Sequence, residues 1–204
     1  MRRFLASAAA RTSVKLFAAA VSAVVVALVS ASVFAETPLL HQAFAPGGSI
    51  RLELSAGDYE IVGTSAKRIR IESRREDDRG VHVRFNAKGK SADIELDGPL
   101  TRGVDARIEI PQQTHLIVKL SAGEMSIRGV EGSKDISARA GEVSIQVGPR
   151  DQYRRVDASV SVGELAASAF NVDKGGLMRS FTWTGKGRYD LRARVLAGEL
   201  NLVP

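Results

Sequence analysis

The chain has 204 residues, with 29 Lys and Arg against 23 Asp and Glu, no cysteine, 19 glycines and 5% aromatic residues. This length suits one modest domain, and without cysteine no disulfide stabilises the fold in an oxidising compartment. Four of the basic residues lie in the first 35 positions, which contain no acidic residue, so 25 basic and 23 acidic residues remain for the rest. Because that balance is nearly neutral, the net charge of +6 does not indicate a nucleic-acid partner.

Residues 1–35 have the pattern of a secretory signal peptide. A polar, basic start is followed by an uncharged run rich in Ala and Val over residues 16–33, and Val33-Phe34-Ala35 offers the short side chains that signal peptidase recognises. We therefore predict cleavage between Ala35 and Glu36. The mature chain would be periplasmic or extracellular, with no stable membrane span after cleavage.

Two alternatives remain open for this segment. An uncleaved anchor is one, because 18 apolar residues are just long enough to cross a bilayer. Twin-arginine export is the other, since the chain contains Arg2-Arg3-Phe4-Leu5, although the usual spacer between the arginine pair and the apolar pair is missing.

After the signal segment, apolar and polar residues alternate with the period of two that is typical of half-buried β-strands. The best helical candidate, residues 37–44, is short and is interrupted by proline. We therefore predict an N-terminal segment over 36–48 and a single all-β repeat domain over 49–204. The apolar positions of the predicted strands are, in chain order, Ile50, Leu52 and Leu54; Ile69 and Ile71; Val81, Val83 and Phe85; Ile94 and Leu96; Val104, Ala106, Ile108 and Ile110; Leu116, Val118 and Leu120; Ile136, Ala138 and Ala140; Val143, Ile145 and Val147; Val156, Ala158, Val160 and Val162; and Tyr189, Leu191, Ala193 and Val195.

A short repeat recurs five times in these strands. Each copy has a small residue, a glycine, an acidic residue and then an alternating apolar pair, as in Ser121-Ala122-Gly123-Glu124-Met125-Ser126-Ile127. The buried parity shifts by one residue within a copy, so we interpret each Gly-acid pair as a structural corner. Glycine is needed at a corner where φ is positive or where neighbouring backbones approach closely. The predicted corner glycines are Gly57, Gly123, Gly141, Gly163 and Gly198.

Two architectures fit this repeat. The last four corner glycines are 18, 22 and 35 residues apart, and spacings near 20 favour a β-solenoid, in which stacked rungs of short strands each turn at a corner. The alternative is an antiparallel β-sandwich, with each Gly-acid pair at the centre of a two-residue hairpin turn. We favour the solenoid because the repeat is regular and typical hairpin dipeptides are rare.

The repeated Ser-Ala-Gly-Glu-Met-Ser-Ile and Ala-Gly-Glu-Val-Ser-Ile units behind a signal peptide resemble the bacterial putative-adhesin family of domains of unknown function. The resemblance covers residues 49–203 and implies a β-helical envelope protein without an assigned activity. The chain departs from a regular array between Gly57 and Gly123, where charged segments at 74–79 and 87–91 interrupt the repeat. The number of rungs is therefore left open.

The acidic residues of the repeat could form a carboxylate ladder if the rungs stack in parallel. Calcium needs six to eight oxygen ligands, but the glycine- and aspartate-rich nonapeptides of calcium-binding β-rolls are missing. We therefore expect solvated corner charges and predict no metal and no cofactor; a paired-carboxylate glycosidase is the enzymatic alternative. The acids concerned are Asp58, Glu124, Glu142, Glu164 and Glu199.

No catalytic residue is predicted. The three histidines, His41, His82 and His115, are not spaced as metal ligands, and no Gly-x-Ser-x-Gly elbow supplies a nucleophile. We expect these histidines to be structural or exposed.

The main concentration of aromatic residues is Phe181, Trp183 and Tyr189. Beside neighbouring cations, exposed rings of this kind can bind sugars or lipid headgroups by stacking and charge. The alternative is a capping strand, because the end of a solenoid must cover its open core.

The sequence as a whole favours an exported, non-enzymatic β-repeat module of the cell envelope with an adhesin-like or structural role. Its expected partner is another envelope component, whether protein, polysaccharide or lipid headgroup. A small outer-membrane barrel is an alternative, although barrels need apolar outward faces and aromatic girdles. A carboxylate-dependent hydrolase is a further alternative.

Overall fold

The computed structural model describes residues 39–75, 79–99 and 101–204, with only the backbone described at 173–175. These residues form strands and two short 3-10 helices, and no helix among them is long and apolar enough to cross a membrane. The predicted signal peptide and its cleavage point lie outside the described residues. The strands are β1 (Leu40–Ala43), β2 (Gly48–Leu54), β3 (Gly57–Thr64), β4 (Arg68–Ser73), β5 (His82–Lys88), β6 (Ser91–Asp97), β7 (Val104–Pro111), β8 (Thr114–Arg128), β9 (Lys134–Gln146), β10 (Tyr153–Ala167), β11 (Val172–Thr184) and β12 (Tyr189–Val203).

The strands form one mixed 12-stranded sheet, so the prediction of an all-β domain is confirmed. Its main path runs β1-β4-β7-β3-β8-β9-β12-β10-β11, while β2 pairs with β8 and carries β6 and then β5 beside it. Strands β8, β9, β12 and β10 are parallel neighbours in that order. Antiparallel pairs occur at the two ends, with β11 on β10 at one end, and β4, β1 and β5 at the other.

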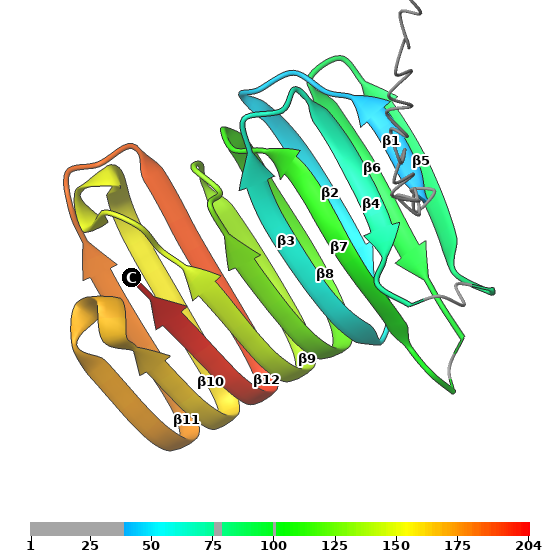
Figure 1. Ribbon diagram of the computed structural model, residues 1–204. Coiled ribbons are helices and arrows are strands. Elements are labelled where there is room, and N and C mark those ends of the chain that lie inside the picture. The colour runs from blue at the N-terminus through cyan, green and yellow to red at the C-terminus, as the bar shows by residue number, and fades with distance from the viewer. Residues whose placement is uncertain (1–38, 76–78, 100) are drawn as a thin grey trace, which may run out of the picture. The chain divides into compact units, whose positions relative to one another are not determined.

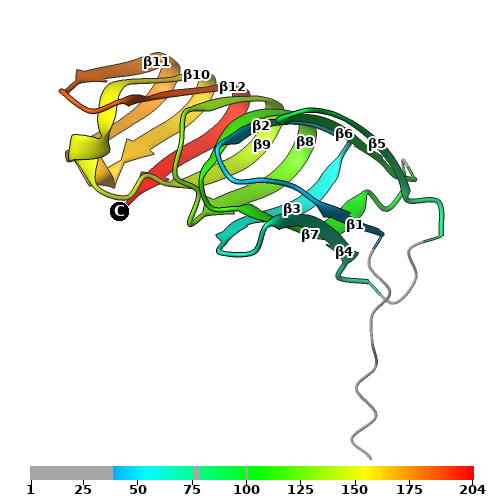
Figure 2. The same ribbon diagram turned by 90° about the horizontal axis from the view of Figure 1, so that it is seen from above.

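The sheet is folded into two limbs at the Gly-acid pairs. Each of the long strands β8, β9, β10 and β12 bends once, as Figure 1 shows. The shorter strands β2 and β3 align with the two halves of β8, and β6 and β7 align with β2 and β3. We call the first limb β2, β5, β6 and the halves of the long strands before the bend; the second limb is β1, β3, β4, β7 and the halves after it (Figure 2).

The Gly-acid pairs lie inside the continuous strands β8, β9, β10 and β12, whereas a hairpin would have placed each pair in a turn between two strands. In the stack, Gly57, Gly123, Gly141, Gly198 and Gly163 are neighbours in that order. Gly141 shows why no larger residue fits. Its φ is +118°, and a Cβ atom built on it would overlap the carbonyl oxygen of Gly123 on the adjacent strand.

Apolar side chains from both limbs form one buried cluster. Most predicted apolar positions are buried, which confirms the alternation along these strands. Val83 and Phe85 are only half-buried because β5 is an edge strand, and Val81, which directly precedes β5, is also half-buried. The prediction was wrong for Val162, which is 53% exposed, because it directly precedes Gly163, where the strand bends and the alternation is interrupted.

The order of strands in space differs from their order in the chain. The C-terminal strand β12 lies between β9 and β10, and the early pair β2 and β3 lies between the β6 and β7 pair and β8. The parallel strand pairs therefore join segments that are far apart in the sequence. This arrangement decides which polar side chains meet on the outer faces.

Candidate functional site

The acidic residues of the repeat occupy aligned positions on neighbouring strands. Asp105 on β7 extends the row beside Asp58, and sequence analysis missed it because Val104 stands opposite Gly57 where the repeat would have a glycine. Asp105 pairs with Arg74, and Glu142 accepts a hydrogen bond from Asn201. No group of three potential metal ligands occurs in the described part of the chain. The row, in strand order, is Asp105, Asp58, Glu124, Glu142, Glu199 and Glu164.

The predicted aromatic residues fall into two separate groups. Phe181 and Trp183 on β11 are half-buried and pack against Phe170, with ring centroids 5.2 and 5.4 Å from its ring. Tyr189 is on β12, and β10 lies between β12 and β11. Its ring meets Tyr153 edge-on at 6.5 Å. The structure therefore does not bring the three residues together as one exposed cluster.

The histidines are dispersed over different strands. His41 and His82 are exposed on β1 and β5, and His115 is exposed on β8. The Nδ1 atom of His115 accepts a hydrogen bond from the backbone N–H of Ser133 at 3.2 Å. This bond ties β8 to the segment before β9, and it gives His115 a structural contact.

A buried lysine links the two limbs at their ends away from the bend. Lys134 is 2% exposed; its Nζ donates to Tyr153 Oη at 2.8 Å, and Tyr153 Oη donates to the carbonyl of Val147 at 2.9 Å. Burial lowers the pKa of Lys134 to about 8, with an opposing effect from the charge of Glu131, and burial raises the pKa of Tyr153 to about 12. The burial of Lys134 could have been predicted from the sequence, because Lys134 alternates in step with the apolar residues Ile136 and Ala138, whose side chains point into the core.

A second charged cluster lies on the outer face of the second limb. The Glu60 carboxylate on β3 contacts Arg107 at 2.9 Å, Arg74 at 3.7 Å, and Arg128. Its side chain is only 12% exposed. Three arginines from different parts of the chain therefore surround one acid, and sequence analysis could not find this group because it depends on strand register.

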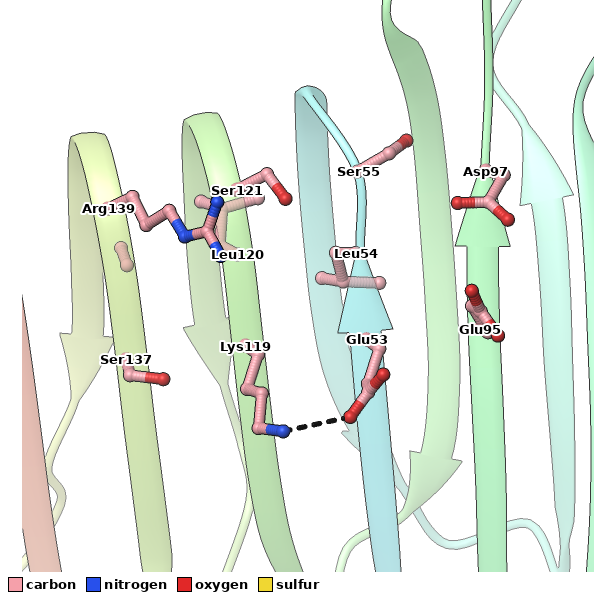
Figure 3. Close-up of a pocket in the computed structure, with 11 residues that line it drawn as sticks. Glu53, Leu54, Ser55, Glu95, Asp97, Lys119, Leu120, Ser121, Ser137 and Arg139 are labelled. Atoms are coloured by element: carbon pink, nitrogen blue, oxygen red, sulfur yellow. Dashed lines mark hydrogen bonds and ion pairs between the residues drawn. The ribbon is translucent and has the colours of Figure 1, made fainter.

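A groove lies on the outer face of the first limb, over β6, β2, β8 and β9 (Figure 3). Its volume is about 410 Å³. Polar residues line it because Leu54, Leu120 and Ala138, which alternate with them, turn their side chains into the core. The polar lining residues are Glu53, Ser55, Glu95, Asp97, Lys119, Ser121, Ser137 and Arg139.

Pairing in the groove neutralises its acids. Glu53 accepts an ion-pair hydrogen bond from Lys119 at 3.0 Å, as Figure 3 shows. Arg84 on β5 binds Glu95 at 2.9 Å through Nε and Asp97 at 2.9 Å through Nη2. The Arg84 guanidinium lowers the pKa of Glu95, mainly through the hydrogen bond that it donates to the Glu95 carboxylate.

Three groups in the groove retain unused hydrogen-bonding capacity. Arg139 makes no ion pair or side-chain hydrogen bond with any described residue, and neither does the hydroxyl of Ser121. The Oγ atom of Ser55 is buried and also makes no hydrogen bond within the described part of the chain. In Figure 3 the Arg139 side chain extends from β9 toward β8. Of these three groups, the exposed Ser121 hydroxyl and the Arg139 guanidinium are accessible to a polar ligand.

Comparison with known proteins supports the fold. No family model matches the chain, and no curated protein matches its sequence. Among solved structures, the chain is similar to a putative cell adhesion protein from Clostridium sporogenes, with a TM-score of 0.51 and 16% sequence identity. The match covers 81% of this chain and 99% of that one. At this identity, the likeness shows a shared fold.

Proposed function

We propose that this protein is an exported, non-enzymatic binding module of the cell envelope with an adhesin-like role. The groove of the first limb carries the proposal, because the exposed Arg139 and Ser121 offer polar groups without partners among the described residues. They lie on the interior strands β9 and β8, which are hydrogen-bonded on both sides, so the surface is held rigid before a ligand arrives. The name of the Clostridium structure, a putative cell adhesion protein, agrees with this role.

The proposed architecture is a β-solenoid with rungs inserted out of chain order. Its support is the parallel alignment of the corner glycines through β3, β8, β9, β12 and β10. A solenoid presents a broad sheet face on which side chains recur at the strand spacing of about 4.8 Å. Such a face suits an extended ligand.

Export follows in this proposal from the pattern of residues 1–35, with Glu36 as the mature N-terminus. The intact mass of the protein from an envelope fraction measures it directly. Retention of residues 1–35 would contradict cleavage and would indicate an anchored protein.

Phe181 and Trp183 have a capping role in this proposal. Both lie on the edge strand β11 and pack against Phe170, which precedes that strand. Tyr189 lies beside Tyr153 at the opposite end of its limb from the bend. We assign these three residues to packing, and the ligand to the groove.

Saturable binding to isolated cell envelopes tests the proposed function. Labelled protein should be retained on washed envelopes, and an excess of unlabelled protein should displace it. Retention that rises linearly with concentration, or that unlabelled protein cannot displace, would contradict a binding module. Treating the envelopes with protease or with periodate shows whether a protein or a polysaccharide is bound.

A further inference from the structure

We propose that the groove over β6, β2, β8 and β9 binds a carboxylate-bearing polysaccharide, with Arg139 pairing with the carboxylate of a uronic acid unit. This inference rests on the proposed function as a binding module. It names the ligand class of the same groove.

The groove is neutral once Arg84 is counted, with three acids and three cations, but the pairing of these charges leaves one cation without a partner. Its three acids are engaged internally, since Glu53 pairs with Lys119, and Glu95 and Asp97 share Arg84. Arg139 has no such partner among the described residues. A ligand carboxylate would therefore meet an available guanidinium, and Arg–carboxylate pairs are among the stronger hydrogen-bonded contacts in proteins.

The adjacent strand extends the positive surface. Arg194 on β12 is exposed, lies in register with Ser137 of β9, and makes no ion pair with any described residue. Arg139 is two residues after Ser137, so the two arginines are diagonal neighbours on adjacent parallel strands, with Cα atoms roughly 8 Å apart for a strand spacing of about 4.8 Å and a rise of about 3.3 Å per residue. Arg194 lies outside the groove, on the side of Arg139 away from β8, where it can meet a further acidic unit of the same polymer.

The length of the groove and its exposed serine suit a sugar chain. Asp97, Ser55, Ser121 and Arg139 follow the aligned residues Leu96, Leu54, Leu120 and Ala138, so they form a row across four neighbouring strands. Three strand spacings make this row about 14 Å long, which is longer than one sugar ring. A serine hydroxyl donates and accepts a hydrogen bond, as a sugar hydroxyl does, and the exposed Ser121 has this capacity free among the described residues.

A peptide fits this surface less well than a sugar polymer. A peptide that adds to a sheet needs an unpaired strand edge, whereas β2, β8 and β9 have neighbours on both sides. A peptide bound through its side chains needs apolar or aromatic pockets, and the groove is lined mainly by charged residues and serines.

Two polymers with the same backbone test the proposal. Polygalacturonate carries the carboxylates, and its fully methyl-esterified form lacks the charge. We expect the protein to bind polygalacturonate at least tenfold more tightly than the ester, and binding to weaken as salt is raised. Arg139→Gln should weaken binding roughly tenfold, and the double variant with Arg194→Gln should weaken it further.

Lys186→Gln is the charge-matched control, because Lys186 is exposed between β11 and β12 and does not line the groove. It should bind as the wild type does, and the melting temperatures of all variants should match the wild type. An equal loss in Lys186→Gln would overturn the proposal in favour of non-specific attraction. Equal affinity for polygalacturonate and dextran sulfate would overturn the requirement for a carboxylate.

The same variants separate this inference from the proposed function. If the protein binds envelopes saturably but does not bind polygalacturonate, the ligand class is wrong and the binding module stands. If Arg139→Gln retains full affinity for polygalacturonate, the assignment of the groove is wrong. If neither envelopes nor polygalacturonate are bound, both proposals fail.

Discussion

The outer faces of the two limbs use similar residues in different ways. On the second limb, Glu60 is surrounded by Arg74, Arg107 and Arg128, so the acid and the arginines satisfy one another. On the first limb, the acids of the groove are paired, but Arg139 has no partner in the described part of the chain. Both faces come from the same alternation of apolar and charged residues. Strand register therefore decides whether charges stabilise the fold or stay available to a ligand.

The largest expected effect is at the corner that both limbs share. Gly141→Val should lower the free energy of unfolding by about 3 kcal/mol or more, because φ is +118° and the new Cβ would overlap Gly123. Glu142→Gln, one residue later, should change it little, since that side chain is exposed. Urea denaturation midpoints measure both. Similar losses in the two variants would show that the acids, and not the glycines, hold the corner.

The second limb should lose more stability than the first limb when an acid is neutralised. Glu60→Gln should cost about 2 to 3 kcal/mol, because it leaves three arginines around a side chain that is largely buried. Glu53→Gln on the first limb is the matched control and should cost less than about 1 kcal/mol, because its pair with Lys119 is exposed. Equal costs in chemical denaturation would remove the proposed difference between the limbs.

The aromatic end of the stack should behave as packing. Trp183→Ala should cost about 2 kcal/mol, less than a fully buried tryptophan, because the ring is half-buried against Phe170. Envelope binding, measured below the melting temperature of the variant, should be retained. Unchanged stability with lost binding would instead make Trp183 a ligand contact.

The link between the limbs at Lys134 should give a modest dependence of stability on pH. The folded-state pKa is about 8 against 10.5 for an ordinary lysine, so between these values the unfolded chain binds more protons than the folded chain. Stability should therefore rise by about 1 to 2 kcal/mol from pH 8 to pH 10. Above pH 10 the raised pKa of Tyr153, about 12, opposes this rise, because the unfolded chain then loses the tyrosine proton first.

Lys134→Met is the variant that isolates this effect, because it keeps an unbranched side chain of similar length without the titrating amine. Its urea midpoint should lose the rise between pH 8 and pH 10. A rise that persists in this variant would assign the pH dependence to another group.

The local sequence pattern predicted the strands, but it could not predict which strands would lie side by side. The parity of Leu116, Val118 and Leu120, and its shift after Gly123, follow from the period of a strand and from the position of glycine. The position of β12 between β9 and β10 depends on long-range pairing, which a single sequence does not encode in any local signal. The groove could not be predicted for the same reason, since its residues come from β6, β2, β8 and β9.

Two local sequence features, the aromatic residues and Lys134, were not interpreted as the structure shows them. The concentration of Phe181, Trp183 and Tyr189 in sequence suggested one aromatic cluster, but β10 separates Tyr189 from the other two. Lys134 stood on a buried parity, where a lysine is exceptional and indicates a specific hydrogen-bonding partner.

One arginine from each limb provides a paired test of the difference between the two outer faces. Arg139→Gln and Arg128→Gln remove the same charge from two exposed side chains, one in the groove and one beside Glu60. Retention on isolated envelopes and the melting temperature are measured on both variants. We expect Arg139→Gln to lose retention with an unchanged melting temperature, and Arg128→Gln to melt earlier and to be retained as the wild type is. Loss of retention in Arg128→Gln alone, or equal behaviour of the two variants, would contradict this expectation.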